Sequence, residues 1–195
     1  MSGSVGDNTA RASGVIAAAS SADMVKIASF NGTGASGTIE VSGCFSADYR
    51  QYQIRAMLYN DNVSQNYVQW YDATAAAYRT SSYFYIVNIA YLSTGPSSSN
   101  TTGRLWDGAY QGQSENNSDS AILPMVMITD VFEPFDSARN TAYKYDWGSK
   151  DATHYRTVNG FGANDANLSF TGFKIYTGSG NYRTQSHGAV YGIKS

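Results

Sequence analysis

Short runs with period-two alternation are the feature that most constrains the fold of this chain. In YRQYQIRAMLYN, residues 49–60, every second side chain from Tyr52 to Leu58 is apolar or aromatic, and most of those between are polar. Clusters of Gly, Ser, Asn and Asp, which favour turns, separate this run from others of the same kind. The runs that predict strands are 24–30, 37–43, 49–60, 66–72, 82–92, 103–112, 121–132, 141–148, 154–161, 167–177 and 188–194.

This succession of short strands predicts an all-β fold, an antiparallel β-sandwich with jelly-roll-like topology. A chain of 195 residues suits a single domain, which we place at residues 24–195. Pro124, near the start of the run 121–132, predicts a sheet edge or a bulge there because proline cannot donate to a strand ladder. The run 82–92 shows little polar alternation, so we expect it to be covered on both faces.

Residues 1–23 are small and polar and carry no periodic core pattern. Alone, such a segment cannot bury enough apolar surface to become ordered. We therefore expect an extended N-terminal arm that contacts a neighbouring subunit or partner, with Val15, Ile16 and Met24 as its apolar contact residues. The apolar patch within the arm has no basic leader before it, so we expect no secretory signal.

The stretch GTGASG, residues 32–37, fits the dinucleotide-binding pattern G-x-G-x-x-G. That pattern binds a pyrophosphate only where a helix begins on the glycines. Here the glycines precede Thr38-Ile39-Glu40-Val41, which alternates as a strand does. We therefore interpret the glycines as the connection of a β-hairpin, where a positive φ is needed.

Charge and cysteine content narrow the function classes. Charged residues make up 14% of the chain and the net charge is −2, with no Lys/Arg run, so we expect neither nucleic-acid nor membrane binding. Cys44 is the single cysteine, and we expect it to be a small buried group. His154 and His187 have no partner at metal-binding spacing, so we expect no metal and no cofactor.

No motif marks a catalytic residue, and we predict that the chain is not an enzyme. Asp130, Glu133 and Asp136 gather in TDVFEPFD, which we interpret as a solvated loop. The fifteen acidic residues leave one alternative open, a depolymerase with two carboxylates across a groove.

Aromatic side chains offer the candidates for binding. Sugar rings stack on such platforms in β-sandwich glycan-binding modules, whereas the alternative for tryptophan and tyrosine is to fill the core with each polar atom hydrogen-bonded. Tyrosine is also enriched at protein–protein contacts. The candidate glycan or partner contacts are Trp70, Tyr71, Trp106, Tyr110 and Trp147.

Three frames of the sequence resemble virion proteins of tailed bacteriophages, cyanophages among them. They cover about half of the chain and are framework patterns that carry no catalytic residue. The frames are GTIEVSGCFSADYRQYQIRAMLYN (37–60), MITDVFEPFDSARNTAYKYDWG (127–148) and LSFTGFKIYTGSGNYRTQSHGAVYGIKS (168–195).

The resemblance implies a jelly-roll particle component, located in the virion, such as a head decoration or cement protein, an appendage or a fibre tip. Its partners would be other copies of itself, as a homotrimer, and virion proteins such as the major capsid protein or tail proteins. No fibre-shaft repeat is present, which favours a compact surface protein. The alternative is a receptor-binding tip or carbohydrate-binding module that contacts a host surface glycan.

Overall fold

The computed structural model describes residues 24–62, 64–92, 96–105, 109–114, 124–150 and 155–194. The predicted arm at residues 1–23, with Val15 and Ile16, and the candidate Trp106 lie outside the described residues.

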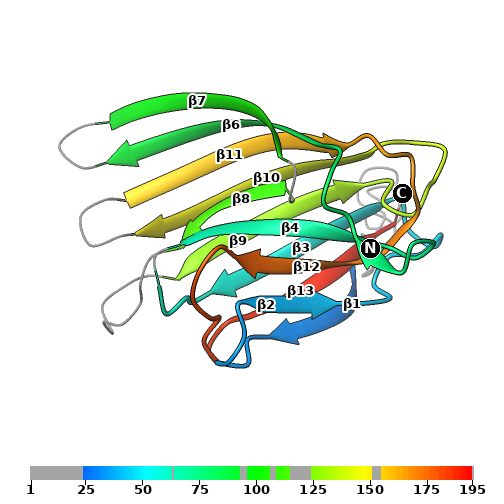
Figure 1. The fold of residues 1–195 in the computed structure, drawn as a ribbon, viewed down its shortest axis with the longest axis horizontal. Helices are drawn as coiled ribbons and strands as arrows, with labels where there is room; N and C mark the ends of the chain where they lie inside the picture. The colour runs from blue at the N-terminus through cyan, green and yellow to red at the C-terminus, as the bar shows by residue number, and fades with distance from the viewer. Residues whose placement is uncertain are drawn as a thin grey trace, which may run out of the picture.

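Two antiparallel sheets form the molecule, and the smaller lies in front of the larger in Figure 1. The larger sheet contains, in spatial order, β1 (Met24–Asn31), β13 (His187–Ile193), β3 (Gln51–Leu58), β9 (Met125–Phe132), β10 (Thr141–Lys150), β11 (Tyr155–Asn164), β6 (Tyr83–Leu92) and β7 (Pro96–Leu105). The smaller contains β2 (Thr38–Val41), β12 (Phe170–Thr177), β4 (Ser64–Asp72) and β5 (Ala77–Tyr78), with β8 (Ala109–Ser114) also paired to β4.

The topology confirms the predicted all-β, antiparallel, jelly-roll-like sandwich. All pairings between the named strands are antiparallel, and the described residues contain no helix. The chain passes repeatedly from one sheet to the other, and its first strands pair with its last, β1 with β13 and β2 with β12. Nesting of this kind is typical of jelly rolls.

Alternation fixes which side chains enter the core. In β3 the burial pattern has period two, and Tyr52, Ile54 and Leu58 are fully buried. Facing them from the smaller sheet are Trp70 and Phe173, whose ring centroids lie 6.5 Å apart at an angle of 74°. Edge-to-face pairs of this kind add about 0.5–1.5 kcal/mol each beyond the apolar area that they bury.

Glycines on the inner face of the larger sheet make room for aromatic rings from the next strand. Tyr145 lies directly opposite Gly160, and a Cβ placed on Gly160 would lie 2.1 Å from Tyr145 Cζ. Tyr143 has the same relation to Gly162, at 2.4 Å, and its hydroxyl reaches beyond it to donate to the Phe84 carbonyl at 3.0 Å. The rings thus lie flat over backbone where another side chain would exclude them, a known means of stabilising glycines in sheets.

The glycine stretch at 32–37 corrects one expectation. It does not close a hairpin, because β1 pairs in the larger sheet and β2 in the smaller, so the glycines carry the chain between sheets. Gly34 has a φ of 78°, and its N–H donates to the Tyr182 carbonyl at 2.9 Å. The glycines therefore allow the sharp crossover from β1 to β2, which is hydrogen-bonded to the loop around Tyr182.

Three strand expectations also need correction. The run 103–112 is two strands, the end of β7 and most of β8, in different sheets. Pro124 comes just before β9, so its missing N–H costs no hydrogen bond of the ladder. Because β9 is a central strand, the proline marks neither an edge nor a bulge. The strand β6 is not covered on both faces, because Phe84 and Ile86 are exposed.

We predict that Gly160→Ala destabilises the protein by about 1–3 kcal/mol, because the new methyl group overlaps the Tyr145 ring. Urea denaturation measures the difference. Gly178→Ala is the matched control: its Cβ would meet its nearest neighbour, Ser64 Oγ, at 3.3 Å, and we expect a loss below about 1 kcal/mol. Equal losses in the two variants would contradict the proposed ring-over-glycine packing.

Candidate functional site

Two of the predicted platform residues belong to the core. Trp70 is 0% exposed and Trp147 is 4% exposed, so neither presents a ring face to a ligand. Trp70 packs against Phe45 and Tyr143, with ring centroids 6.1 and 5.8 Å away. The prediction of a glycan or partner contact is therefore wrong for these two residues, and both fill the core as the alternative expected. The other half of that alternative is wrong, because neither buried indole N–H has a hydrogen-bond partner among the described residues.

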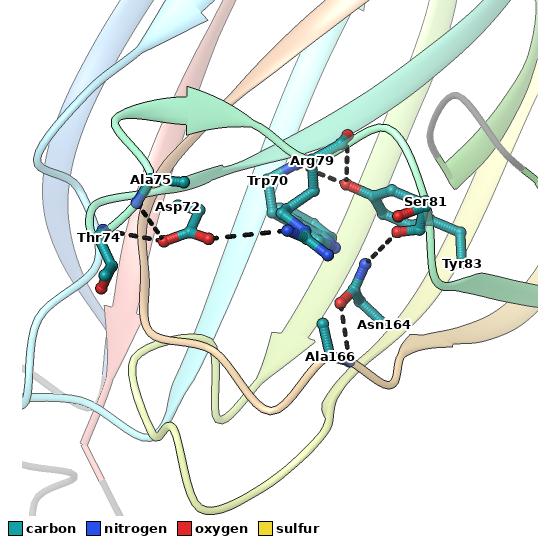
Figure 2. A network of polar contacts seen from close by, with 9 residues as sticks. All are labelled: Trp70, Asp72, Thr74, Ala75, Arg79, Ser81, Tyr83, Asn164 and Ala166. Atoms are coloured by element: carbon teal, nitrogen blue, oxygen red, sulfur yellow. Dashed lines mark hydrogen bonds and ion pairs between the residues drawn. The ribbon is translucent and has the colours of Figure 1, made fainter.

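Trp70 also anchors the chain where it crosses from the smaller to the larger sheet (Figure 2). Its backbone N–H donates to the Tyr83 hydroxyl at 2.8 Å, and its carbonyl accepts the Arg79 N–H at 2.9 Å. The Tyr83 hydroxyl in turn donates to the Arg79 carbonyl at 3.4 Å, and burial raises the pKa of Tyr83. The phenol thus stays neutral and serves as a structural donor and acceptor.

Asp72, at the end of β4, completes this network (Figure 2). Its buried carboxylate accepts the N–H groups of Thr74 and Ala75 at 2.9 and 3.1 Å and lies 4.0 Å from Arg79 Nη1. Nearby, the Asn164 amide donates to the Ser81 carbonyl at 3.1 Å. Because the turn between β4 and β5 already donates two hydrogen bonds to this carboxylate, we assign the network a structural role.

Tyrosines gather on the outer face of the five-stranded sheet, and we call Tyr67, Tyr71, Tyr78 and Tyr176 the tyrosine face. The rings of Tyr67 and Tyr176 stack at 5.2 Å, and those of Tyr71 and Tyr78 meet edge-on at 5.1 Å. Lys174 Nζ lies 4.5 Å from the Tyr78 ring centre and 5.4 Å from that of Tyr176. Burial, followed by the charge of Glu40, raises the pKa of Tyr78 to about 12.

The tyrosine face contains one predicted residue, Tyr71. Tyr110, also predicted, lies on β8 opposite Tyr67 in the ladder, and its side chain is outside the described part of the chain. The prediction missed Tyr67, Tyr78 and Tyr176. Tyr67, Gln69 and Tyr71 alternate with period two, and this spacing could have placed both tyrosines of β4 on one face.

Large apolar side chains are exposed on the opposite side of the molecule. Among the described residues, every exposed large hydrophobic lies on the eight-stranded sheet. Three of them form a group that we call the apolar patch: Phe84 and Ile86 of β6 and Phe161 of β11, which are 40, 60 and 53% exposed. Phe161 lies directly opposite Ile86 in the ladder, so the three side chains are contiguous.

A second feature of the same face is a hollow of about 400 Å³ over β13 and its neighbours. It opens where Ala189, a small residue, lies between His187 and Tyr191 on β13 and opposite Arg55 on β3. We call it the basic groove, and its lining includes Lys26, Arg55, His187, Tyr191, Val126 and Ile128. The predicted arm residue Met24, half-exposed at the start of β1, accepts a weak hydrogen bond from Arg55 at 3.7 Å.

A third hollow, of about 480 Å³, lies among the loops around Tyr49, Arg50, Glu133, Phe135 and Asp136. Arg50 pairs with the Glu133 carboxylate, which also lies 3.7 Å from Arg139 Nη1.

In the same loop, Asp136 pairs with Arg139 at 3.2 Å. Two of the three carboxylates of the predicted solvated cluster TDVFEPFD, those of Glu133 and Asp136, thus share the Arg139 guanidinium in an ion-paired loop. Asp130 lies apart from it on β9 and accepts a hydrogen bond from Gln53 at 2.8 Å.

Other sequence expectations concern metals, membranes and the cysteine. In the described ranges, no group of three or more His, Cys, Asp and Glu side chains could hold a metal ion. No helix long and apolar enough to cross a membrane was found in those ranges. Cys44 is buried, as predicted, and burial raises the pKa of its thiol to about 12.

Comparisons with known proteins do not assign a family. No family model matches the chain, and no curated protein matches it. One similar solved structure is the catalytic domain of an endo-1,3-beta-glucanase (laminarinase) from Thermotoga petrophila RKU-1, with 11% identity and a TM-score of 0.23. The alignment covers 81% of this chain and 69% of that one. A likeness this low supports no argument about the activity of this chain.

We predict that Cys44 in the folded protein reacts with a disulfide reagent at about pH 8 at least 100-fold more slowly than in concentrated guanidinium chloride. The buried thiol stays protonated because its raised pKa lies above that pH. Absorbance of the released thiolate measures the rate. Similar rates in the two conditions would show an accessible thiol and contradict the burial.

Proposed function

We propose that this chain is a structural component of a bacteriophage virion, a capsid decoration or surface appendage protein that acts by protein–protein contact. The observation that carries the proposal is the apolar patch of Phe84, Ile86 and Phe161. Contiguous exposed apolar side chains on one face of a sheet are typical of protein contact surfaces, so the patch favours an interface. The resemblance of the three sequence frames to tailed-phage virion proteins supplies the kind of particle.

The surroundings of the patch also favour a contact surface. Beside Phe161, Lys144 of β10 forms an ion pair with Asp146 at 3.7 Å, and Asp146 accepts a hydrogen bond from Asn159. An apolar centre with a polar margin is the usual anatomy of a protein interface. Because only 14% of residues are charged, few ions lose their hydration when the face is covered. We assign the patch to contact between copies of the chain, in a homotrimer.

We predict that Phe161→Glu weakens self-association by at least about 2 kcal/mol, roughly thirtyfold in dissociation constant, because a carboxylate replaces the centre of the patch. Light scattering on a concentration series gives the mass, and quantitative mass spectrometry of purified phage particles gives the occupancy, which we expect to fall in parallel.

Thr157→Glu is the control for this experiment. Thr157 is exposed on the same strand and face but lies outside the patch, so we expect association and occupancy to stay unchanged. A wild-type chain absent from the particle would contradict the virion proposal. A wild-type chain that stays monomeric at all concentrations would contradict the self-association.

The tyrosine face favours a second candidate function, recognition of a host surface glycan. Tyr67 and Tyr176 present half-buried rings beside the Lys174 ammonium and the Glu40 carboxylate, a combination of flat apolar surface and hydrogen-bonding groups that suits sugar rings. The two functions are compatible, because the tyrosine face and the apolar patch lie on different sheets.

If the tyrosine face binds glycan, Tyr176→Ala should weaken binding on an array of host polysaccharides by about 1–2 kcal/mol. Tyr191→Ala, which removes a half-buried tyrosine from the other sheet, should leave the same signals unchanged. Silence of the wild-type chain across the array would remove this second candidate.

A further inference from the structure

The basic groove combines free cations with an apolar floor. No carboxylate lies within 4.0 Å of the charged nitrogens of Lys26 or Arg55 among the described residues, although Arg50, Arg79, Arg139 and Lys144 all have ion pairs. The residues that line the hollow include no Asp and no Glu. In a chain with a net charge of −2, the groove is therefore a local positive site with no carboxylate in its lining among the described residues. Arg55 is linked to Asp130 through Gln53, which donates to that carboxylate at 2.8 Å.

Neighbouring side chains restrain Arg55 and leave it able to donate. Its Nε donates to Gln53 Oε1 at 2.5 Å, and the centre of its guanidinium lies 5.4 Å from the centre of the Tyr191 ring. Its one further side-chain hydrogen bond among the described residues is the weak bond from Nη2 to the sulfur of Met24. Nη1 therefore remains free for an incoming carboxylate, and the restrained side chain loses little entropy when one binds.

The floor of the groove favours a ligand with apolar side chains. Val126 and Ile128 of β9 are 46 and 38% exposed, and Ile128 lies directly opposite Arg55 in the ladder. The small Ala189 side chain on the other side of Arg55 leaves the depression into which a side chain can enter. A carboxylate bound at Arg55 would thus hold its neighbouring residue over apolar surface.

We propose that the basic groove binds an acidic, apolar-containing segment of a protein partner in the virion. The inference rests on the proposed function, because the groove would be a second contact with the particle, on the same outer face as the apolar patch. Charge complementarity selects an acidic ligand. Lys26, Arg55 and His187 are too few for a nucleic acid, which needs a long basic stripe. The apolar floor also offers no hydrogen bond or charge to a phosphate backbone.

The test uses the full chain and a fluorescein-labelled peptide of alternating glutamate and leucine, with a lysine–leucine peptide of the same length as the reversed-charge probe. Fluorescence anisotropy should show saturable binding of the acidic peptide, weakened by added sodium chloride, and no binding of the basic one. Arg55→Glu should raise the dissociation constant of the acidic peptide at least about tenfold. Ala189→Phe, which fills the depression and keeps every charge, should raise this dissociation constant by a similar factor.

Two controls separate this inference from the proposed function. Lys194→Glu changes an exposed cation outside the groove and should alter affinity less than about twofold. Phe161→Glu replaces the centre of the apolar patch, which β10 separates from the groove. This variant should bind the peptide as the wild type does.

Some outcomes would overturn the inference even if the apolar patch assembles the particle. They are absence of peptide binding, equal binding by the wild type and Arg55→Glu, retained binding by Ala189→Phe, or tighter binding of single-stranded DNA than of the acidic peptide. Conversely, normal peptide binding by a chain that never enters a particle would leave the groove valid and refute the virion function.

Discussion

The packing of aromatic rings against glycine backbone is the constraint on which the rest of this structure depends. Tyr145 and Tyr143 lie over Gly160 and Gly162, and Gly188 leaves space for Phe30 in the same way. These pairs let the inner faces of the two sheets close on large buried rings, Trp70 among them. The core is filled from the inner faces, so the apolar side chains of the outer face contribute nothing to it and require another explanation.

That separation gives each outer face its own chemistry. The smaller sheet presents tyrosines with Lys174 and Glu40, which suit a hydrated ligand. The larger sheet presents the apolar patch and the basic groove, with the polar residues of β10 between them. The sandwich places these surfaces on its two outer faces, and the proposed function rests on their contact chemistry.

Sequence alone predicted most strands because one buried face imposes period two, as in β3 and β9. It missed residues 96–102 of β7, PSSSNTT, which have no apolar pattern and pair through their backbone with β6. It expected β6 to be covered on both faces, because an apolar run looks the same whether a sheet or a partner covers it. Burial of Trp70 and exposure of Phe161 depend on which face of each strand turns toward the other sheet, and local sequence does not encode that choice.

The central claim is that the outer face of the eight-stranded sheet is covered by protein in the assembled particle. Cryo-electron microscopy of the particle, with this chain placed in the map, tests it most directly. We expect Phe84, Ile86 and Phe161 to lie against a neighbouring copy. A map in which these three side chains face solvent while the chain is held by other surfaces would contradict the account.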